Sequence, residues 1–135
     1  MNKHILNFAL ITFISIAFIS CKKEEEKEVE PTTVTISMSE PAVNDTIPFN
    51  GELHIEGTIS ASSEVHGYSL SATNTTTSAS LLSVNYDVHA TTYNFHEHLV
   101  NTLTDTTTVK VKIVVTKDHD GNQEINERNV VFLPQ

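Results

Sequence analysis

Apolar and polar residues alternate along most of the chain after residue 32, and this period of two limits the fold more than any other feature. Successive side chains of a β-strand point to opposite faces, so the pattern builds strands that are buried on one face and wet on the other. Seven short runs show it, at about 34–38, 53–59, 68–72, 82–88, 93–95, 109–115 and 130–132. Since no segment has convincing helical periodicity, we predict an all-β domain, a single sandwich of about seven antiparallel strands.

Turn-forming residues separate these runs. The segments 39–50 and 74–80 hold Pro, Asn, Asp and a Thr/Ser stretch, so both are predicted to be surface loops. Near the end of the chain, Val-Thr-Lys-Asp-His-Asp-Gly-Asn at 115–122 joins two alternating runs. The whole segment 109–132 is similar to the last hairpin of bacterial immunoglobulin-like domains. This resemblance implies an immunoglobulin-like sandwich, a module that serves exported proteins as an adhesive, spacer or glycan-binding unit.

Cys21 is the single cysteine, and it follows an uncharged, largely apolar run of 16 residues that begins after a basic end containing Lys3. That run is shorter than the ~20 residues of a membrane-spanning helix and has the form of a cleaved secretory signal. Cleavage after Ser20 would make Cys21 the new N-terminus. Its thiol and amine can then carry acyl chains such as palmitate, and stable anchoring needs more than one chain.

The residues Phe18-Ile19-Ser20-Cys21 resemble the lipobox of bacterial lipoproteins, although Phe18 and Ile19 depart from the usual Leu and small residue. The run Lys-Lys-Glu-Glu-Glu at 22–26 is similar to the export signal of Bacteroidota surface lipoproteins, and the alternative is a plain solvated tether. These resemblances imply a signal peptide at 1–20, a lipidated cysteine and charged tether at 21–31, and a folded domain at 32–135. They also imply an outer-membrane location, surface-exposed or facing the periplasm.

The charge balance excludes one class of partner. Removing residues 1–20 takes one lysine with it and leaves seven basic residues against 17 acidic ones, a net charge of about −10 with His neutral. Phosphate binding draws on clustered Lys and Arg, so we expect no nucleic-acid partner. With Cys21 lipidated there is no disulfide to form, and the domain must be stabilised by burial and sheet hydrogen bonds alone.

Histidine is the unusual chemical resource of the chain, and His96-Glu97-His98 is its sharpest pattern. Residues two apart on a strand share a face, so two imidazoles can converge on one ion. If the 82–88 and 93–99 runs pair as a hairpin, Asp87 and His89 fall on the same face. Imidazole and carboxylate together suit zinc or copper. The alternative is a set of ordinary polar residues on the wet face of a hairpin, because His-x-His alone is a weak motif.

Two other histidine positions carry weaker predictions. His54 lies between Glu52 and Glu56 on one outward face, which is a second place for a divalent ion, and no sequence argument brings it near the 93–99 run. His66 has the inward parity of Tyr68 and is predicted at the edge of the sandwich.

The acidic turn near the C-terminus partly matches a calcium-binding loop. Asp118, Asp120 and Glu127 fall at the third, fifth and twelfth positions of an EF-hand-like loop, but Thr116 occupies the first, where Asp is needed. A plain Asp-Gly turn is the favoured interpretation. Weak calcium binding through Asp118, Asp120 and Asn122 is the alternative.

Enzymatic motifs are missing from the sequence. It has no Cys for catalysis, no G-x-S-x-G, no phosphate-cradling glycine loop and no H-E-x-x-H. Two segments, Asp45-Thr46-Ile47 and Asp105-Thr106-Thr107, look like the O-glycosylation motif of Bacteroidota, and both are predicted in loops. We therefore expect no catalysis and no resident cofactor. The leading hypothesis is a lipid-anchored module that binds a protein or glycan, and the alternative is an exported zinc- or copper-binding lipoprotein.

Overall fold

The computed structural model describes residues 30–135. The signal segment 1–20, Cys21 and nearly all of the charged tether lie outside these described residues. Within them, no helix is long and apolar enough to cross a membrane.

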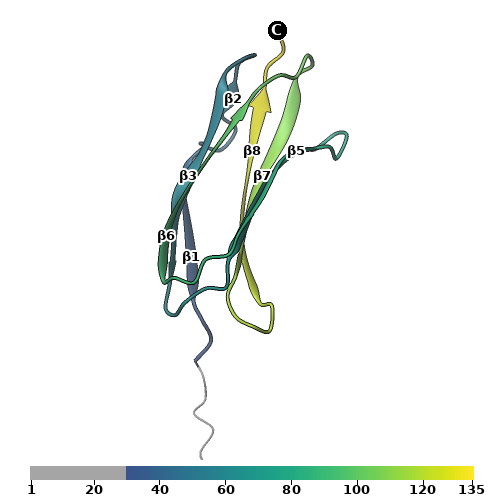
Figure 1. The fold of residues 1–135 in the computed structure, drawn as a ribbon. Coiled ribbons are helices and arrows are strands. Elements are labelled where there is room, and N and C mark those ends of the chain that lie inside the picture. Colours follow the sequence, from purple (N-terminus) through teal and green to yellow (C-terminus); the bar gives the residue numbers. More distant parts are fainter. Residues whose placement is uncertain (1–29) are drawn as a thin grey trace, which may run out of the picture.

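The described chain forms two β-sheets packed face to face (Figure 1). One sheet has three strands in the order β1-β3-β6, and the other has five in the order β2-β8-β7-β4-β5. Their bounds are β1 Val34–Glu40, β2 Thr46–Ile47, β3 Glu52–Ala61, β4 Tyr68–Asn74, β5 Ser80–Tyr86, β6 Thr92–Val100, β7 Thr107–Thr116 and β8 Gln123–Phe132. All neighbours are antiparallel except β2 and β8, which are parallel. Successive strands cross repeatedly between the sheets, as in immunoglobulin-like sandwiches, so the predicted fold class is confirmed.

Alternating burial produces the core. On β7, Val109, Val111, Ile113 and Val115 are all 0% exposed, while the residues between them are only partly buried. They lie in the same buried apolar cluster as Leu53 of the three-stranded sheet. Each such side chain contributes about 1.5–3 kcal/mol when fully buried. All seven predicted runs lie wholly or largely in strands, and the core is complete within residues 34–132.

The segment 39–50 is not entirely a loop. It contains β2, whose Thr46 and Ile47 pair with Val131 and Phe132 of β8, and Ile47 is buried. A two-residue strand is too short to show a period of two, so the sequence pattern missed it. The segment 74–80 is a connection as predicted, closed by Asn74, whose side chain accepts hydrogen bonds from the backbone of Thr76 and Thr77.

The predicted hairpin between 82–88 and 93–99 is wrong. β5 pairs with β4 in the five-stranded sheet, and β6 pairs with β3 in the other. The connection 87–91 therefore crosses from one sheet to the other. A short connection of this kind has the same sequence signature as a hairpin turn, because strand periodicity does not specify the pairing partner.

Side-chain hydrogen bonds tie the two sheets together at their edges. Asn126 Nδ2 of β8 donates to the carbonyl of Ile36, 3.1 Å away, and Arg128 Nη2 donates to that of Met38 at 2.6 Å. These bonds satisfy carbonyl groups of the edge strand β1. On the opposite side, the Tyr86 hydroxyl of β5 donates to the Glu97 carboxylate of β6.

Candidate metal centre

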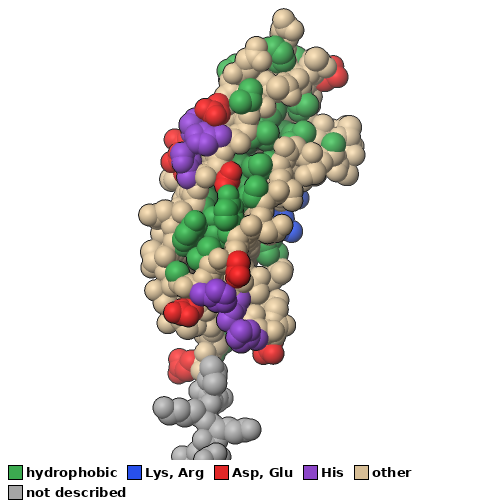
Figure 2. Space-filling model, viewed as in Figure 1, with side chains coloured by type: hydrophobic (Ala, Val, Ile, Leu, Met, Phe, Trp, Pro, Cys, Tyr) green, Lys and Arg blue, Asp and Glu red, His purple; other side chains and the backbone are tan. Residues whose placement is uncertain are grey.

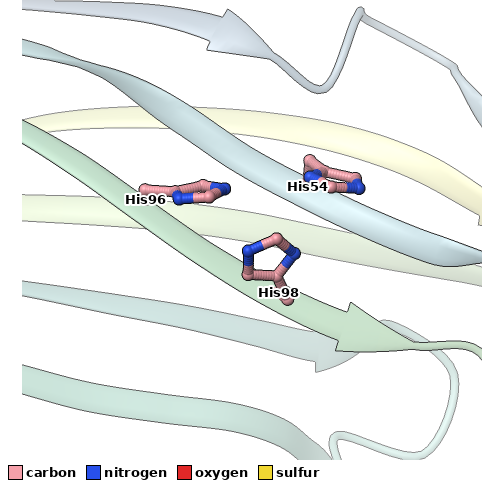
Figure 3. A group of neighbouring side chains, drawn as sticks. All are labelled: His54, His96 and His98. Carbon is pink, nitrogen blue, oxygen red and sulfur yellow. The ribbon is translucent and has the colours of Figure 1, made fainter.

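The register of β3 against β6 brings three histidines together. His54 pairs directly with His98, and Glu56 pairs with His96. Leu53 and Ile55 flank His54 and are fully buried, so the alternation turns His54 outward. On β6, His96 and His98 are exposed and alternate with the buried Phe95 and the partly buried Glu97 and Leu99. Figure 3 shows His54 on β3 next to His96 and His98 on β6. The predicted site at His54 and the predicted site at His96 and His98 are therefore one place.

The three imidazoles are close enough to share an ion. Ring centroids are 4.2 Å apart for His96 and His98, 4.6 Å for His54 and His98, and 6.1 Å for His54 and His96. One ring nitrogen from each residue lies within 4.8 Å of the other two. The side chains are about half exposed, at 39%, 53% and 42% for His54, His96 and His98.

Two glutamates of β3 contact all three rings. Glu56 Oε1 lies 2.8 Å from His96 Nε2 and 3.7 Å from His54 Nδ1. The carboxylate of Glu52 lies 3.2 Å from His98 Nδ1 and 3.5 Å from His54 Nε2. We name these five residues, Glu52, His54, Glu56, His96 and His98, the histidine patch. Figure 2 shows histidine and acidic side chains gathered on this part of the surface.

Glu40 extends the acidic side of the patch. It pairs with Glu56 across the β1–β3 ladder, and its carboxylate joins His54 and Glu56 in a second group of possible ligand atoms within 4.8 Å of one another. The arrangement offers imidazole ligands toward β6 and carboxylate ligands toward β1. Imidazole suits zinc and copper, whereas carboxylate alone suits calcium or magnesium.

Asp87 and His89 do not join this patch. They lie in the 87–91 connection, where His89 Nε2 is 3.1 Å from Asp87 Oδ1. The His89 ring lies 5.3 Å from that of His66, which lies 4.0 Å from that of His119, so a second histidine group forms from three connections. Asp87 and His89 therefore do not share a face with His96 and His98. The prediction that these residues share a face is wrong, because it depended on the hairpin between 82–88 and 93–99.

The 117–122 segment is the predicted turn. The backbone NH of Lys117 donates to the carbonyl of Asn122 at 2.8 Å, and Gly121 has a φ of +80°, a left-handed conformation that favours glycine. Asp118 accepts bonds from the Asp120 NH, the Asn122 NH and Asn122 Nδ2. The bond from the Asn122 side chain lowers the pKa of Asp118 most. Both Asp118 oxygens thus serve the turn, and calcium binding by Asp118, Asp120 and Asn122 stays a prediction.

The two predicted glycosylation sites, Thr46 and Thr106, lie in different kinds of segment. Thr106 lies in the exposed connection after β6, whereas Thr46 belongs to β2 and not to a loop, with its side chain exposed. Glycosylation of either stays a prediction. Cys21, the predicted lipidation site, lies outside the described residues.

Two tyrosines between the sheets have raised pKa values. Burial raises the pKa of Tyr68 well above its usual range, with a further contribution from the Tyr93 side chain. The hydrogen bond to Glu97 raises the pKa of Tyr86. Both rings belong to the aromatic group of Tyr68, Tyr86, Tyr93 and Phe95 between the sheets.

Comparison with known proteins adds little to this geometry. No protein-family model and no curated protein matches the chain. Among solved structures it is similar to fibronectin(III)-like modules of Clostridium thermocellum CbhA, with a TM-score of 0.43 and 15% identity over 77% of this chain and 47% of that one. It is also similar to murine CRIg, with a TM-score of 0.44 and 11% identity over 76% of this chain and 98% of that one. The chain thus spans about half the length of the CbhA chain. Similarity this low carries no argument, so the fold assignment rests on strand order.

Proposed function

We propose that this chain is a lipid-anchored, non-catalytic binding or accessory module of the outer membrane, with a protein or glycan as its ligand. The observation that carries the proposal is the place where the chain enters the sandwich. The Ser62 NH donates to the Thr33 carbonyl at 3.0 Å, and the Thr33 NH donates to Ser62 Oγ at 3.0 Å. Thr32 and Ser63 join their hydroxyl groups at 2.6 Å. The first folded residues are therefore fastened to the β3–β4 connection.

This attachment gives an anchored module a defined orientation. The chain enters at the end that carries the β3–β4 and β7–β8 connections, and the C-terminus lies at the opposite end (Figure 1). A tether from Cys21 to residue 30 reaches at most about 35 Å when fully extended. With Cys21 in the bilayer, the entry end stays near the membrane, and the C-terminal end and both outer sheet faces are available to a ligand.

The surface hollows support a non-catalytic role. One, of about 300 Å³, is lined by Tyr68, Tyr86 and Val114 and by more numerous polar residues such as Ser69, Asn85 and Gln123. Another, of about 280 Å³, lies among Glu30, Asp118 and neighbouring residues of the entry end. Small-molecule sites are mostly lined by apolar and aromatic side chains around a few polar groups. A shallow polar surface fits contact with a macromolecule better.

The anchor is tested by Cys21→Ser in cells that process lipoproteins. The wild-type chain should incorporate a labelled fatty acid and sediment with outer membranes, and Cys21→Ser should lose both properties. Ser63→Ala, at the entry end but outside the signal, is the control and should retain both. Equal labelling of Cys21→Ser would refute the anchor.

Display on the outer surface needs a separate measurement. Replacing Glu24, Glu25 and Glu26 by Gln should leave fatty-acid labelling intact. On whole cells, the domain of this variant should be protected from added protease, because it would no longer be displayed on the outer surface. If the variant remains as accessible as wild type, the acidic run is only a tether.

A further inference from the structure

We propose that the histidine patch is a binding site for one divalent transition-metal ion, zinc or copper(II), held by His54, His96 and His98. The site is independent of the anchor and goes beyond the function proposed above. It requires three imidazoles from two strands, and neither strand supplies it alone.

Strand pairing gives the site a rigid base. Nine consecutive residue pairs join β3 to β6, from Glu52↔Val100 to Ser60↔Thr92. The inward neighbours Leu53, Ile55 and Phe95 are buried at 0%, 0% and 2% exposure, so the backbone beneath the patch is held by the core. The ligand side chains lie above it, exposed enough to adjust. The backbone spacing is therefore fixed before any ion arrives.

The spacing of the nitrogens suits a small ion. Tetrahedral zinc with bonds of 2.0–2.1 Å needs ligand nitrogens about 3.4 Å apart. The present separations are within 4.8 Å, so modest side-chain rotations close the site without backbone movement. Three imidazoles leave one position for water or for a carboxylate, as in sites with three protein ligands.

The glutamates supply the orientation and charge that such a site needs. Glu56 contacts Nε2 of His96 and Glu52 contacts Nδ1 of His98, which leaves the other nitrogen of each ring for the ion. His54 has a carboxylate near both nitrogens, at 3.5 and 3.7 Å, and the ion would replace one of these longer contacts. Histidine ligands of metals commonly donate their second nitrogen to a carboxylate. Two carboxylates beside the three imidazoles would also balance the charge of a divalent ion. The acid–histidine contacts thus have the form of a ligand shell and its supporting residues.

The rest of this sheet face contrasts with the patch. The outward residues toward the entry end are hydroxyl and amide side chains, such as Thr58, which donates to Asn94 Oδ1 at 2.9 Å. The other histidine group, His66, His89 and His119, makes ring contacts but is not among the ligand groups found within 4.8 Å in the described residues. It provides a matched control with the same kind of side chain elsewhere on the same molecule.

The test uses residues 22–135 without a histidine tag, a chain that contains the complete sandwich core. Titration calorimetry and thermal melts are run with zinc, copper(II), calcium and EDTA. Wild type should bind one zinc ion per chain and melt roughly 10 °C or more higher at 100-fold excess over Kd. Copper(II) should bind more tightly than zinc. EDTA should reverse both shifts, and calcium should give none.

Four variants, one of them a control, locate the site. His54→Ala should abolish stoichiometric zinc binding, and so should His96→Ala with His98→Ala, while the control His89→Ala with His119→Ala retains it. Glu52→Gln with Glu56→Gln should weaken zinc binding about 10- to 100-fold. Unchanged binding in His54→Ala would overturn the three-histidine site, and loss in the control pair would move binding to the other group.

Two further results would also overturn the proposal. If calcium raised the melting temperature as much as zinc, and Glu40→Gln abolished that rise, the ion would belong to the group of Glu40, His54 and Glu56 instead. Absence of any zinc or copper response in wild type would refute the metal site outright. Circular dichroism of each variant shows whether the fold is retained, and cobalt(II) absorption reports imidazole coordination directly.

Discussion

Asn101 is a fully buried polar residue that holds one end of the sandwich together. Its Nδ2 donates to the carbonyls of Ile47 and Leu133 at 2.9 and 2.8 Å, and its Oδ1 accepts from the Leu103 NH at 3.0 Å. It is 0% exposed. One side chain thus satisfies backbone groups of three separate segments, and water cannot replace those bonds.

Asn101→Ala should lower the free energy of unfolding by about 3 kcal/mol, because two backbone carbonyls and one backbone NH lose their partners. Urea denaturation measures the change. Asn94→Ala is the control, since Asn94 is exposed and, within residues 30–135, its side chain makes one hydrogen bond, from Thr58; the change should cost less than about 1 kcal/mol. Equal losses in the two variants would contradict the role given to Asn101.

Tyr86 and Tyr68 make stability sensitive to alkali. Both have pKa values raised above the ordinary 10.0, Tyr86 mainly by its bond to Glu97 and Tyr68 mainly by burial. A raised pKa means that the unfolded state loses its proton first. The stabilisation is therefore fully present below pH 10 and is lost as the pH rises through the folded-state pKa.

The free energy of unfolding should accordingly stay constant up to about pH 10 and fall as the pH rises further. Tyr86→Phe should be less stable than wild type below that pH and decline less steeply above it, because one of the two groups is gone. Denaturation curves at several pH values give both slopes. The same slope in both proteins would show that Tyr86 does not titrate as described.

At the scale of elements, Gly57 permits the close approach of β1, β3 and β6. A Cβ there would lie 2.2 Å from the Ser37 carbonyl oxygen and 2.5 Å from the Phe95 ring. Gly57 pairs with Met38 on one side and Phe95 on the other. The aromatic ring thus occupies the space that a side chain at 57 would take.

Gly57→Ala should destabilise the sandwich by about 1–3 kcal/mol or more, because the clash includes backbone as well as a ring. In a Phe95→Leu background the same substitution should still destabilise, since the Ser37 carbonyl remains. Gly121→Ala is the control. Among the described residues, no atom lies within 4 Å of a Cβ added at Gly121, so only the φ of +80° opposes this substitution, at a cost of about 1 kcal/mol. Thermal melts compare wild type with Gly57→Ala, Phe95→Leu, the double variant and Gly121→Ala.

Sequence periodicity predicts the strands better than it predicts their partners. Val109 to Val115 alternate so regularly that their strand and buried face follow directly. The pairing of β5 with β4, and of β6 with β3, depends on contacts between distant segments that a period of two does not encode. His96 and His98 were found because they are two apart on one strand. The outward direction of His54 also follows from the period of two. Its position beside His96 and His98 does not, because it depends on the register of β3 against β6.

At the scale of the whole molecule, the proposed lipid anchor makes a measurable prediction. Cys21 is the only cysteine, so in the lipidated protein a new thiol can be labelled alone. A fluorophore on Ser63→Cys at the entry end should be quenched by bilayer headgroup quenchers more strongly than one on Gln135→Cys at the C-terminal end. Equal quenching would show that the sandwich lies flat on the membrane.

The opposite placement of entry point and C-terminus has a mechanical consequence. A ligand held at the distal end would pull against the anchor along the long axis, so β1 would be loaded lengthwise. Its ladder to β3 and the Asn126 and Arg128 bonds to its carbonyls would then bear the force together rather than open one after another. The strand nearest the tether is thus fastened on both sides, in the geometry that resists shear.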